Sequence, residues 1–355
     1  MNITVAIRVR PFNKREKEIK SKLCIEMINN KINIYNEKKV NKTFGFDYCF
    51  WSHDGFQNQL DGYSASILNS NYADQLFVYE KIGKNLLTNI IEGYNSTLFA
   101  YGQTGSGKSY SIFGYGNNKG ILPMICEDLF KGDFLTKNLN NQFILSVSMI
   151  EIYNEKIQDL LISINNRTKE GLKVRENNKI GIFIENVTSI NVNSYEDILK
   201  IIFKGEKNRT LGATLMNETS SRSHTIFSID LLQKTNNNNK TTTKQAKLNI
   251  VDLAGSERIT KTHAEGQRLK ESQSINKSLT VLGMVIHQLY EKECGKHVNI
   301  SYRDSVLTRI LQDALGGNSK TTMLCAVSPA LDNIDETLST LRYEKKKKNK
   351  TKCYY

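Results

Sequence analysis

A glycine-rich segment supplies the clearest chemistry in the chain. Gly102 to Ser109 reads GQTGSGKS and matches the pattern G-x-x-x-x-G-K-[ST] in full. Glycines let successive backbone N–H groups turn inward around phosphate oxygens. Lys108 can then reach the β- and γ-phosphates, and the hydroxyl of Ser109 can bind Mg²⁺. The residues predicted to bind the phosphates of a nucleoside triphosphate are Gly102, Gln103, Thr104, Gly105, Ser106, Gly107, Lys108 and Ser109.

Two polar clusters farther along the chain could complete such a site. Asp252 follows an apolar strand, where an acid binds Mg²⁺ through water in P-loop enzymes, and the N–H of Gly255 could reach a γ-phosphate. Asn217 to His224 reads NETSSRSH; its hydroxyls could bind Mg²⁺ or position water, and Arg222 could stabilise charge. Alone, D-x-x-G is common and a serine-rich run is more often an ordinary loop. Beside a phosphate-binding loop, both clusters become candidates.

The elements that must position these residues follow from the hydrophobic pattern. Alternating or continuous apolar runs predict strands, and apolar residues three and four apart predict helices. Strands are expected at 5–10, 97–101, 143–153, 225–232, 246–253 and 323–327, helices at 74–91, 194–203 and 272–291, and a polar surface loop at 57–71. Helices that alternate with strands around a glycine loop predict an α/β P-loop fold.

Composition limits the class of protein. The chain has 355 residues, 39% of them hydrophobic, which suffices for one large core or at most two domains. The net charge of +13 favours a polyanionic partner, although a solvated lysine-rich surface explains it equally well. No apolar run approaches the roughly 20 residues that cross a bilayer, so membrane insertion is not expected. The six scattered cysteines, with no CxxC pair, are typical of reduced thiols in a cytosolic protein.

Taken together, these motifs resemble a kinesin motor domain. The segments 101–109, 217–224 and 252–257 are similar to the P-loop, switch I and switch II of kinesins, in the family's order. Similarity also covers the adenine-pocket segment, the switch II helix and the last helices, at 8–11, 265–279, 302–318 and 336–343. Within the family, the stretches 46–53, 127–130 and 302–308 resemble the vesicle-transport subfamily, the third kinesin family.

The resemblance implies the kinesin-motor version of the P-loop NTPase fold, a central mixed sheet flanked by helices on both faces. It implies one motor domain at 1–343, with a lysine-rich tail at 344–355 in place of a typical neck linker. That end reads as a truncated product or a divergent tail. The implied cofactors are ATP and Mg²⁺, and the implied partner is the microtubule. The motor domain would be a cytoplasmic, cytoskeletal ATPase, monomeric on its own and without a nucleic-acid partner.

Site residues follow from the matched positions. Those that would line the adenine are Arg8, Arg10, Pro11 and Tyr110. Ser109 would bind Mg²⁺ directly and Asp252 through water. The residues that would close over the γ-phosphate, place the attacking water or relay its proton are Asn217, Ser220, Ser221, Arg222, Gly255 and Glu257. Arg222 and Glu257 would form a salt bridge when ATP is bound. The cations that would contact tubulin are Lys156, Arg268, Lys270, Lys277, Arg303 and Arg309.

Two other functions remain open at this point. A nucleotide-gated microtubule-binding protein that does not move, but regulates filament ends or stability, is favoured by the unusual residues at 344–355. A P-loop ATPase acting on nucleic acid is suggested only by the positive charge, and the chain lacks the aromatic-plus-basic motifs of that class.

Overall fold

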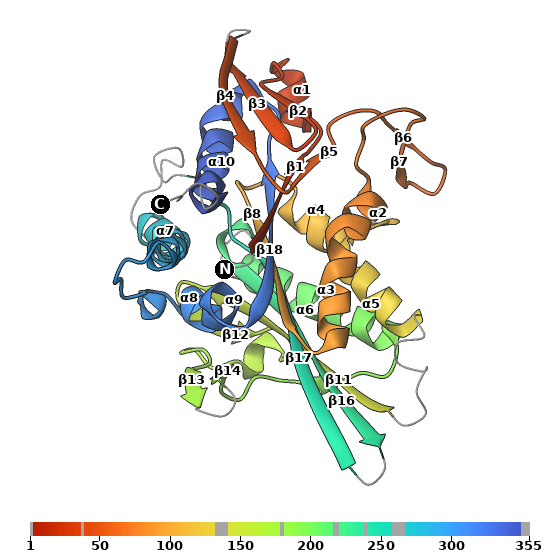
Figure 1. Cartoon of the computed structure of the whole chain (residues 1–355), viewed down its shortest axis with the longest axis vertical. Helices are drawn as coiled ribbons and strands as arrows, with labels where there is room; N and C mark the ends of the chain where they lie inside the picture. Colours follow the sequence, from red (N-terminus) through yellow and green to blue (C-terminus); the bar gives the residue numbers. More distant parts are fainter. Residues whose placement is uncertain are drawn as a thin grey trace.

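A large mixed β-sheet crosses the molecule and carries helices on both faces (Figure 1). The computed structural model describes residues 3–36, 39–131, 141–177, 181–215, 220–237, 240–257 and 267–348. Within them, the strands of the main sheet are, in spatial order, β12 (Lys156–Asp159), β11 (Asn141–Tyr153), β16 (His224–Asn237), β17 (Lys240–Asp252), β8 (Asn95–Tyr101), β18 (Ser319–Val327), β1 (Ile3–Val9) and β5 (Tyr48–Trp51), with β15 (Ile190–Asn191) beside β11.

The order of the strands brings two of the predicted clusters together. From β17 through β8, β18 and β1 to β5 the strands are parallel, whereas β12, β11, β16 and β17 pair antiparallel. Asp252, the last residue of β17, is in register with Ala100 of β8. Because the carboxyl ends of parallel strands meet at one edge of a sheet, the glycine-rich segment after β8 lies beside Asp252.

Two hydrophobic clusters lie on opposite faces of the sheet. Successive side chains of a strand point to opposite faces: in β8, Leu98 and Ala100 belong to one cluster, and Phe99 and Tyr101 to the other. The first face is covered by α2 (Gln75–Val78), the π-helical turn η1 (Tyr79–Gly83), α3 (Lys84–Glu92), α4 (Lys108–Ile112), α5 (Ile121–Lys131) and α6 (Tyr195–Leu215). The second is covered by α7 (Gln267–Glu293), α8 (Val306–Ile310), α9 (Gln312–Gly316) and α10 (Ile334–Lys348).

Smaller elements surround this core. A three-stranded sheet, drawn at the top of Figure 1, is formed by β2 (Ile25–Ile28), β3 (Lys31–Asn36) and β4 (Lys39–Gly45), near the short helix α1 (Lys14–Glu18). The two-stranded pairs are β6 (Phe56–Asn58) with β7 (Ser64–Ser66), β9 (Gly114–Tyr115) with β10 (Asn118–Lys119), and β13 (Val174–Asn177) with β14 (Gly181–Ile184). The 3₁₀ turns are η2 (Ile164–Asn166), η3 (Ser220–Arg222), η5 (Tyr302–Asp304) and η6 (Leu331–Asn333).

The predicted α/β architecture is confirmed, with differences in the extent of several elements. The stretch predicted as a surface loop at 57–71 contains the β6–β7 hairpin, which Asn118 fixes: its Oδ1 accepts from the Ser64 N–H at 2.9 Å and its Nδ2 donates to the Gly62 carbonyl at 2.9 Å. The helix predicted to end near Phe203 continues as α6 to Leu215. Its later turns contain a buried polar residue, Arg209, so the apolar period ends although the helix continues.

The final helix crosses the expected domain boundary. α10 runs without a break from Ile334 through Lys348, past residue 343. The boundary itself stays a prediction. Over the described part of the chain, no helix has both the length and the apolar character required to span a bilayer.

Candidate functional site

The glycine-rich loop has a backbone that only glycine adopts easily. Gly102, Gly105 and Gly107 have φ angles of +145°, +71° and +103°, in a region that L-amino acids rarely occupy. A Cβ atom at Gly102 would also lie 2.2 Å from the carbonyl oxygen of Ala326. Gly107 is the N-cap residue of α4, so the loop leads directly into a helix N-terminus. This is the geometry expected of a phosphate-binding loop.

Lys108 folds back over this loop. Its ammonium group donates hydrogen bonds to the carbonyl oxygens of Gly102 at 2.8 Å and Gln103 at 3.0 Å, and the residue is 8% exposed. Burial lowers the pKa of the ammonium group, whereas the nearby carboxylates of Asp252 and Glu257 oppose that shift. The positive charge is thus held at the loop, where phosphate oxygens would accept its hydrogen bonds.

Ser109 and Asp252 form the best candidate for a cation site. The Ser109 hydroxyl donates to Asp252 Oδ2 at 2.6 Å. The other oxygen, Oδ1, is buried and has no hydrogen-bond partner among the described residues. Buried polar atoms normally have a partner, and a hydroxyl beside a carboxylate provides the oxygen ligands that Mg²⁺ prefers. The two residues therefore fit a Mg²⁺ ion bound by Ser109 and, through water, by Asp252.

The loop after β17 contacts both the glycine-rich loop and η3. The Gly255 N–H donates to the Ser221 carbonyl at 2.8 Å, so a bond from Gly255 to a phosphate would require this contact to be exchanged. The Glu257 carboxylate accepts from the Thr104 N–H at 2.8 Å and from the Thr104 hydroxyl. The predicted pairing of Glu257 with Arg222 stays a prediction.

Two of the predicted catalytic residues, Asn217 and Ser220, belong to the segment before β16. Asn217 lies outside the described residues, and Ser220 is described by its backbone alone, in η3. Ser221 and Arg222 belong to the same turn. The structure therefore brings η3 and the loop after β17 together but does not test the assigned roles.

His224 connects three elements of the site, a role that the sequence did not predict. At the start of β16, its Nδ1 accepts from the Ala254 N–H at 3.0 Å, so in the neutral ring Nε2 carries the proton and donates to the Ser278 hydroxyl of α7 at 2.8 Å. Burial, with smaller effects from Lys108 and Arg209, lowers the pKa of His224 to about 3. The ring stays neutral at physiological pH and connects β16, the loop after β17 and α7.

A buried arginine forms the wall predicted to meet the base. Arg8 is 3% exposed, and its guanidinium carbon lies 5.3 Å from the centre of the Tyr110 ring. Its Nε donates to the Ser52 hydroxyl at 3.0 Å. One terminal nitrogen donates to Gln75 Oε1 at 2.6 Å and to the Ser111 hydroxyl at 3.0 Å. The structure thus joins two residues predicted for the adenine, Arg8 and Tyr110, and adds Gln75, which no motif indicated.

Arg10, which directly follows β1, connects the end of that strand to the glycine-rich loop. Its Nε donates to the Gly105 carbonyl at 2.6 Å, and another nitrogen donates to the carbonyl of the predicted adenine neighbour Pro11 at 2.7 Å. The guanidinium also forms a two-pronged ion pair with Glu16, at 2.6 and 2.7 Å. Glu16 is a second supporting residue that was not predicted.

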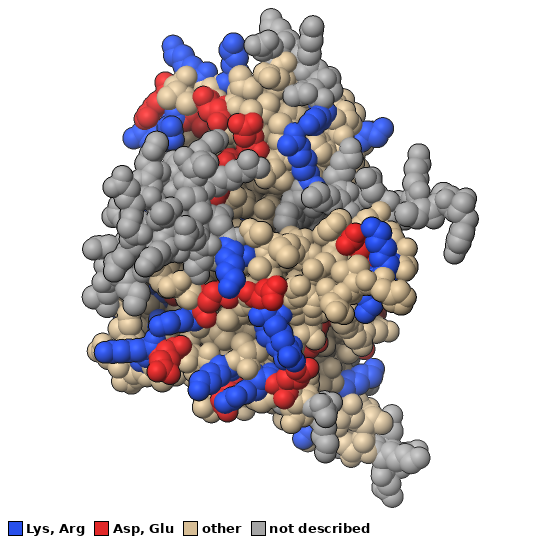
Figure 2. Space-filling view, turned by 90° about the vertical axis from the view of Figure 1, so that its left-hand side faces the viewer, with Lys and Arg blue, Asp and Glu red and all other residues tan. Residues whose placement is uncertain are grey.

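The cations predicted to contact tubulin differ in their surroundings. Figure 2 shows the face that carries α7 and α8, where blue Lys and Arg side chains lie between red Asp and Glu side chains. Lys277 and Lys156 are exposed, and Lys156 donates to the Lys169 carbonyl at 3.1 Å. Arg303 is 78% exposed, whereas Arg309 is 17% exposed and pairs with Glu176. For Arg268 and Lys270 only the backbone, in α7, is described.

Comparisons with known proteins converge on one family. A model of the family "Kinesin motor domain" matches residues 8–350. The chain is 45% identical over 361 residues to human kinesin-like protein KIF13B, and 46% identical over 371 residues to kinesin-related protein 1 of Dictyostelium discoideum. The matches cover 98% and 99% of this chain but 19% and 16% of those relatives. The chain therefore spans less than a fifth of the length of these two relatives.

Solved structures agree with this result. A KIF14 dimer with AMP-PNP in complex with a microtubule superimposes with a TM-score of 0.87 and 43% identity, covering 98% of this chain and 93% of that one. KIF14 with ADP in complex with a microtubule gives a TM-score of 0.84 and 40% identity, covering 100% and 98%. The similarity to KIF13B and to rat KIF1A, at 47% identity, agrees with the resemblance to the third kinesin family.

Proposed function

Because this chain belongs to the kinesin family, we propose that it is a microtubule-stimulated ATPase that couples ATP hydrolysis to movement or force along microtubules. The observation that carries the proposal is the joint geometry of Lys108, Ser109 and Asp252 at the carboxyl ends of β8 and β17. Phosphoryl transfer needs little covalent chemistry from the protein, so a positioned ammonium group, a hydroxyl and a carboxylate supply much of what it requires.

Mg²⁺ is the proposed metal cofactor. Among the described residues, no group of three or more His, Cys, Asp or Glu side chains is arranged to bind a metal ion by itself. The ion would therefore need phosphate oxygens and water in addition to Ser109 and Asp252, as is usual for Mg²⁺. When bound, it would neutralise charge on the β- and γ-phosphates. Asp252 supports this assignment through its buried, unpartnered Oδ1.

The remaining site residues are proposed to act on water and on the base. Arg8, Arg10, Pro11 and Tyr110 would bind the adenine side of the nucleotide. Glu257 would relay the proton of the attacking water. Since Glu257 now bonds to Thr104 of the glycine-rich loop, nucleotide binding would exchange that bond for the pairing with Arg222. The residues proposed to close over the γ-phosphate with Gly255 are Asn217, Ser220 and Ser221.

The microtubule is the proposed partner, and the cytoskeleton, within the cytoplasm, is the proposed location. The exposed cations on the face of α7 and α8 would contact acidic tubulin, which fits the net charge of +13. The alternative of a non-motile, nucleotide-gated binder is not favoured by the similarity to KIF14, whose structures contain a microtubule and the dimer's "two-heads-bound state".

Steady-state ATP hydrolysis with and without microtubules tests the proposal. We expect microtubules to raise the turnover rate strongly, because the filament stabilises the motor's catalytic state. A Lys108→Ala variant should lose this activity by at least about a hundredfold, since a positioned charge on the transferred phosphate is often the largest catalytic contribution.

The outcomes separate the two candidate functions. Activation by microtubules that is lost in Lys108→Ala supports the motor-type cycle. Microtubule binding without activation would instead support the nucleotide-gated binder. A gliding assay with the motor fixed to a surface then decides whether hydrolysis produces movement.

A further inference from the structure

We propose that Gln75 is a positioning residue of the nucleotide site, whose side-chain amide fixes the wall that meets the base. Gln75 begins α2, far from the glycine-rich loop in sequence and outside every recognised motif. The inference rests on the proposed ATPase function and deepens it, because it names a residue that sets base recognition without touching the phosphates.

The amide of Gln75 bonds to three separate elements. Its Oε1 accepts from Arg8 of β1 at 2.6 Å. Its Nε2 donates to the carbonyl of Tyr110 in α4 at 2.7 Å, and to the carbonyl of Asn118 in β10 at 3.3 Å. The residue is 2% exposed. One rigid planar group therefore sets the separation between β1, the helix that follows the glycine-rich loop, and the β9–β10 hairpin.

Because the charged guanidinium group of Arg8 is buried, its hydrogen bond to Gln75 is costly to lose. Among the described residues, the groups that accept hydrogen bonds from Arg8 are uncharged: the Gln75 amide and the hydroxyls of Ser52 and Ser111. Removal of one acceptor from a buried charge costs more than the loss of an ordinary hydrogen bond. Gln75, together with Ser52 and Ser111, therefore holds Arg8 in its orientation, 5.3 Å from the Tyr110 ring centre.

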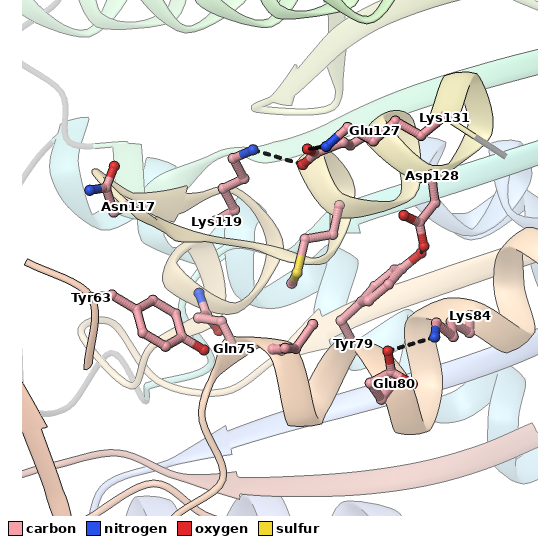
Figure 3. A pocket seen from close by; sticks show the side chains of 12 residues that line it. Tyr63, Gln75, Tyr79, Glu80, Lys84, Asn117, Lys119, Glu127, Asp128 and Lys131 are labelled. Atoms are coloured by element: carbon pink, nitrogen blue, oxygen red, sulfur yellow. Dashed lines mark hydrogen bonds and ion pairs between the residues drawn. The ribbon is translucent and has the colours of Figure 1, made fainter. Parts of the chain in front are cut away.

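The donor side of the amide fixes the other half of the wall. The bond from Gln75 Nε2 to the Tyr110 carbonyl fixes the backbone that carries the ring predicted to meet the base. Lys108 is held instead by the carbonyls of Gly102 and Gln103, so its position does not depend on Gln75. Figure 3 shows Gln75 and Tyr79 on one helical segment, with Gln75 towards the hairpin that carries Asn117 and Lys119 and Tyr79 towards Asp128 of α5. Glutamate has the same shape as glutamine, so Gln75→Glu requires no backbone shift. A pocket of about 380 Å³ lies beside Gln75.

A Gln75→Glu variant separates the two functions of the amide. The carboxylate still accepts from Arg8 but has no N–H for the Tyr110 carbonyl. We expect the KM for ATP to rise about tenfold with kcat at saturating ATP within twofold of wild type, the signature of lost binding rather than lost catalysis. The preference for ATP over GTP should fall, which a general loss of stability would not produce.

Asn117→Ala is the matched control. It removes a 2.7 Å bond from Asn117, in the β9–β10 hairpin, to the Asp61 carbonyl in the β6–β7 hairpin. It leaves the bonds of Gln75 and Arg8 intact, so KM and base preference should be unchanged. Gln75→Asn, the second variant, keeps the amide but is one methylene shorter, so it cannot keep the contacts to Arg8, Tyr110 and Asn118 together and should likewise raise the KM for ATP and lower the preference for ATP. If the glutamate variant fails to fold in a thermal melt, the asparagine variant decides.

Wild-type KM and wild-type ATP/GTP preference in the folded variants would overturn the inference. A wild-type protein without ATPase activity would overturn the proposed function instead. In that case equilibrium binding of ADP and GDP gives the same comparison: a tenfold weaker ADP affinity in Gln75→Glu supports the role of Gln75, and an unchanged affinity refutes it.

Discussion

Glu16 connects the glycine-rich loop with residues that are distant in sequence. Its carboxylate accepts from Arg10, which in turn donates to the Gly105 carbonyl. It also accepts from the Ser328 hydroxyl at 2.8 Å and from Asn333 Nδ2 at 2.9 Å. Burial alone would raise the pKa of Glu16, but the hydrogen bonds from Arg10, the Asn13 amide and Ser328 lower it to about 2.

This lowered pKa predicts an acid-sensitive contribution to stability. The folded-state pKa of Glu16 lies below its ordinary value of 4.5, so the stabilisation is complete above about pH 4.5 and is lost as the pH falls towards 2. Glu16→Gln should therefore reduce the free energy of unfolding by about 3 kcal/mol at pH 7 and by much less at pH 3. Urea denaturation at both pH values measures this.

Glu18→Gln provides the control on the same helix. Glu18 is 62% exposed, and its ion pair with Lys14 is long, at 4.0 Å. Its replacement should therefore change the free energy of unfolding by less than about 0.5 kcal/mol at either pH. If Glu16→Gln and wild type lost stability in parallel between pH 7 and pH 3, Glu16 would not be the responsible group.

Residues of the site differ in how far the sequence reveals them. The glycine-rich loop is predictable because its chemistry depends on neighbouring residues, Gly102 to Ser109. Glu16, Gln75 and His224 are not, because their partners lie far away in sequence: 312 positions separate Glu16 from Ser328. One local signal existed, since Asn13 and Glu16 form a capping box at α1, but a capping box does not indicate Arg10, which directly follows β1, as a partner.

Two arginines that lie near each other, Arg303 in η5 and Arg309 in α8, should differ in what they contribute: the first to microtubule affinity and the second to thermal stability. Arg303 is 78% exposed and Arg309 is 17% exposed, although both approach Glu176. Arg309 also donates to Gln312 at 2.9 Å. We expect Arg303→Ala to weaken microtubule affinity several-fold without changing the melting temperature. Arg309→Ala should lower the melting temperature by a few degrees, because it removes a partly buried pair. Cosedimentation and thermal melts measure the two effects.

Glu176→Gln is the matched variant for this pair. It breaks the ion pair from the other side, so it should lower the melting temperature as Arg309→Ala does while leaving affinity nearly unchanged. If Arg303→Ala bound microtubules as tightly as wild type, η5 would not be part of the filament contact.

The extent of each element was harder to predict than its existence. The hairpin predicted at 225–232 and 246–253 extends to β16 (His224–Asn237) and β17 (Lys240–Asp252). Its outer part pairs polar residues, such as Lys234 with Thr243. Backbone hydrogen bonds continue there although the hydrophobic alternation has ended, so a reading based on burial stops too early.

The charge of the whole molecule predicts how binding responds to salt. A net charge of +13 would attract the chain to an acidic filament, and mobile ions largely screen exposed charges that lie more than about 8 Å apart at physiological ionic strength. We expect microtubule affinity to fall about tenfold or more between 50 and 200 mM KCl, which cosedimentation measures.

The KM for ATP in the absence of microtubules serves as the internal control. Lys108 and Arg8 are buried, so the nucleotide site should respond far less to the same change of salt. Microtubule affinity that did not depend on salt would contradict an electrostatic contribution to filament binding.

The position of β1 in the sheet has a consequence for the order in which the protein can fold. β1, formed by Ile3–Val9, pairs with β18, formed by Ser319–Val327, in seven aligned positions from Ile3 with Thr321 to Val9 with Val327. β18 in turn lies between β1 and β8. During synthesis on the ribosome, β1 and β8 emerge early, but the strand that joins them emerges some three hundred residues after the first. In the nascent domain, the edges of β1 and β8 that pair with β18 therefore stay unpaired until β18 is synthesised. Only then can Arg8 form its bond to Ser111 of α4 and Arg10 its bond to Gly105.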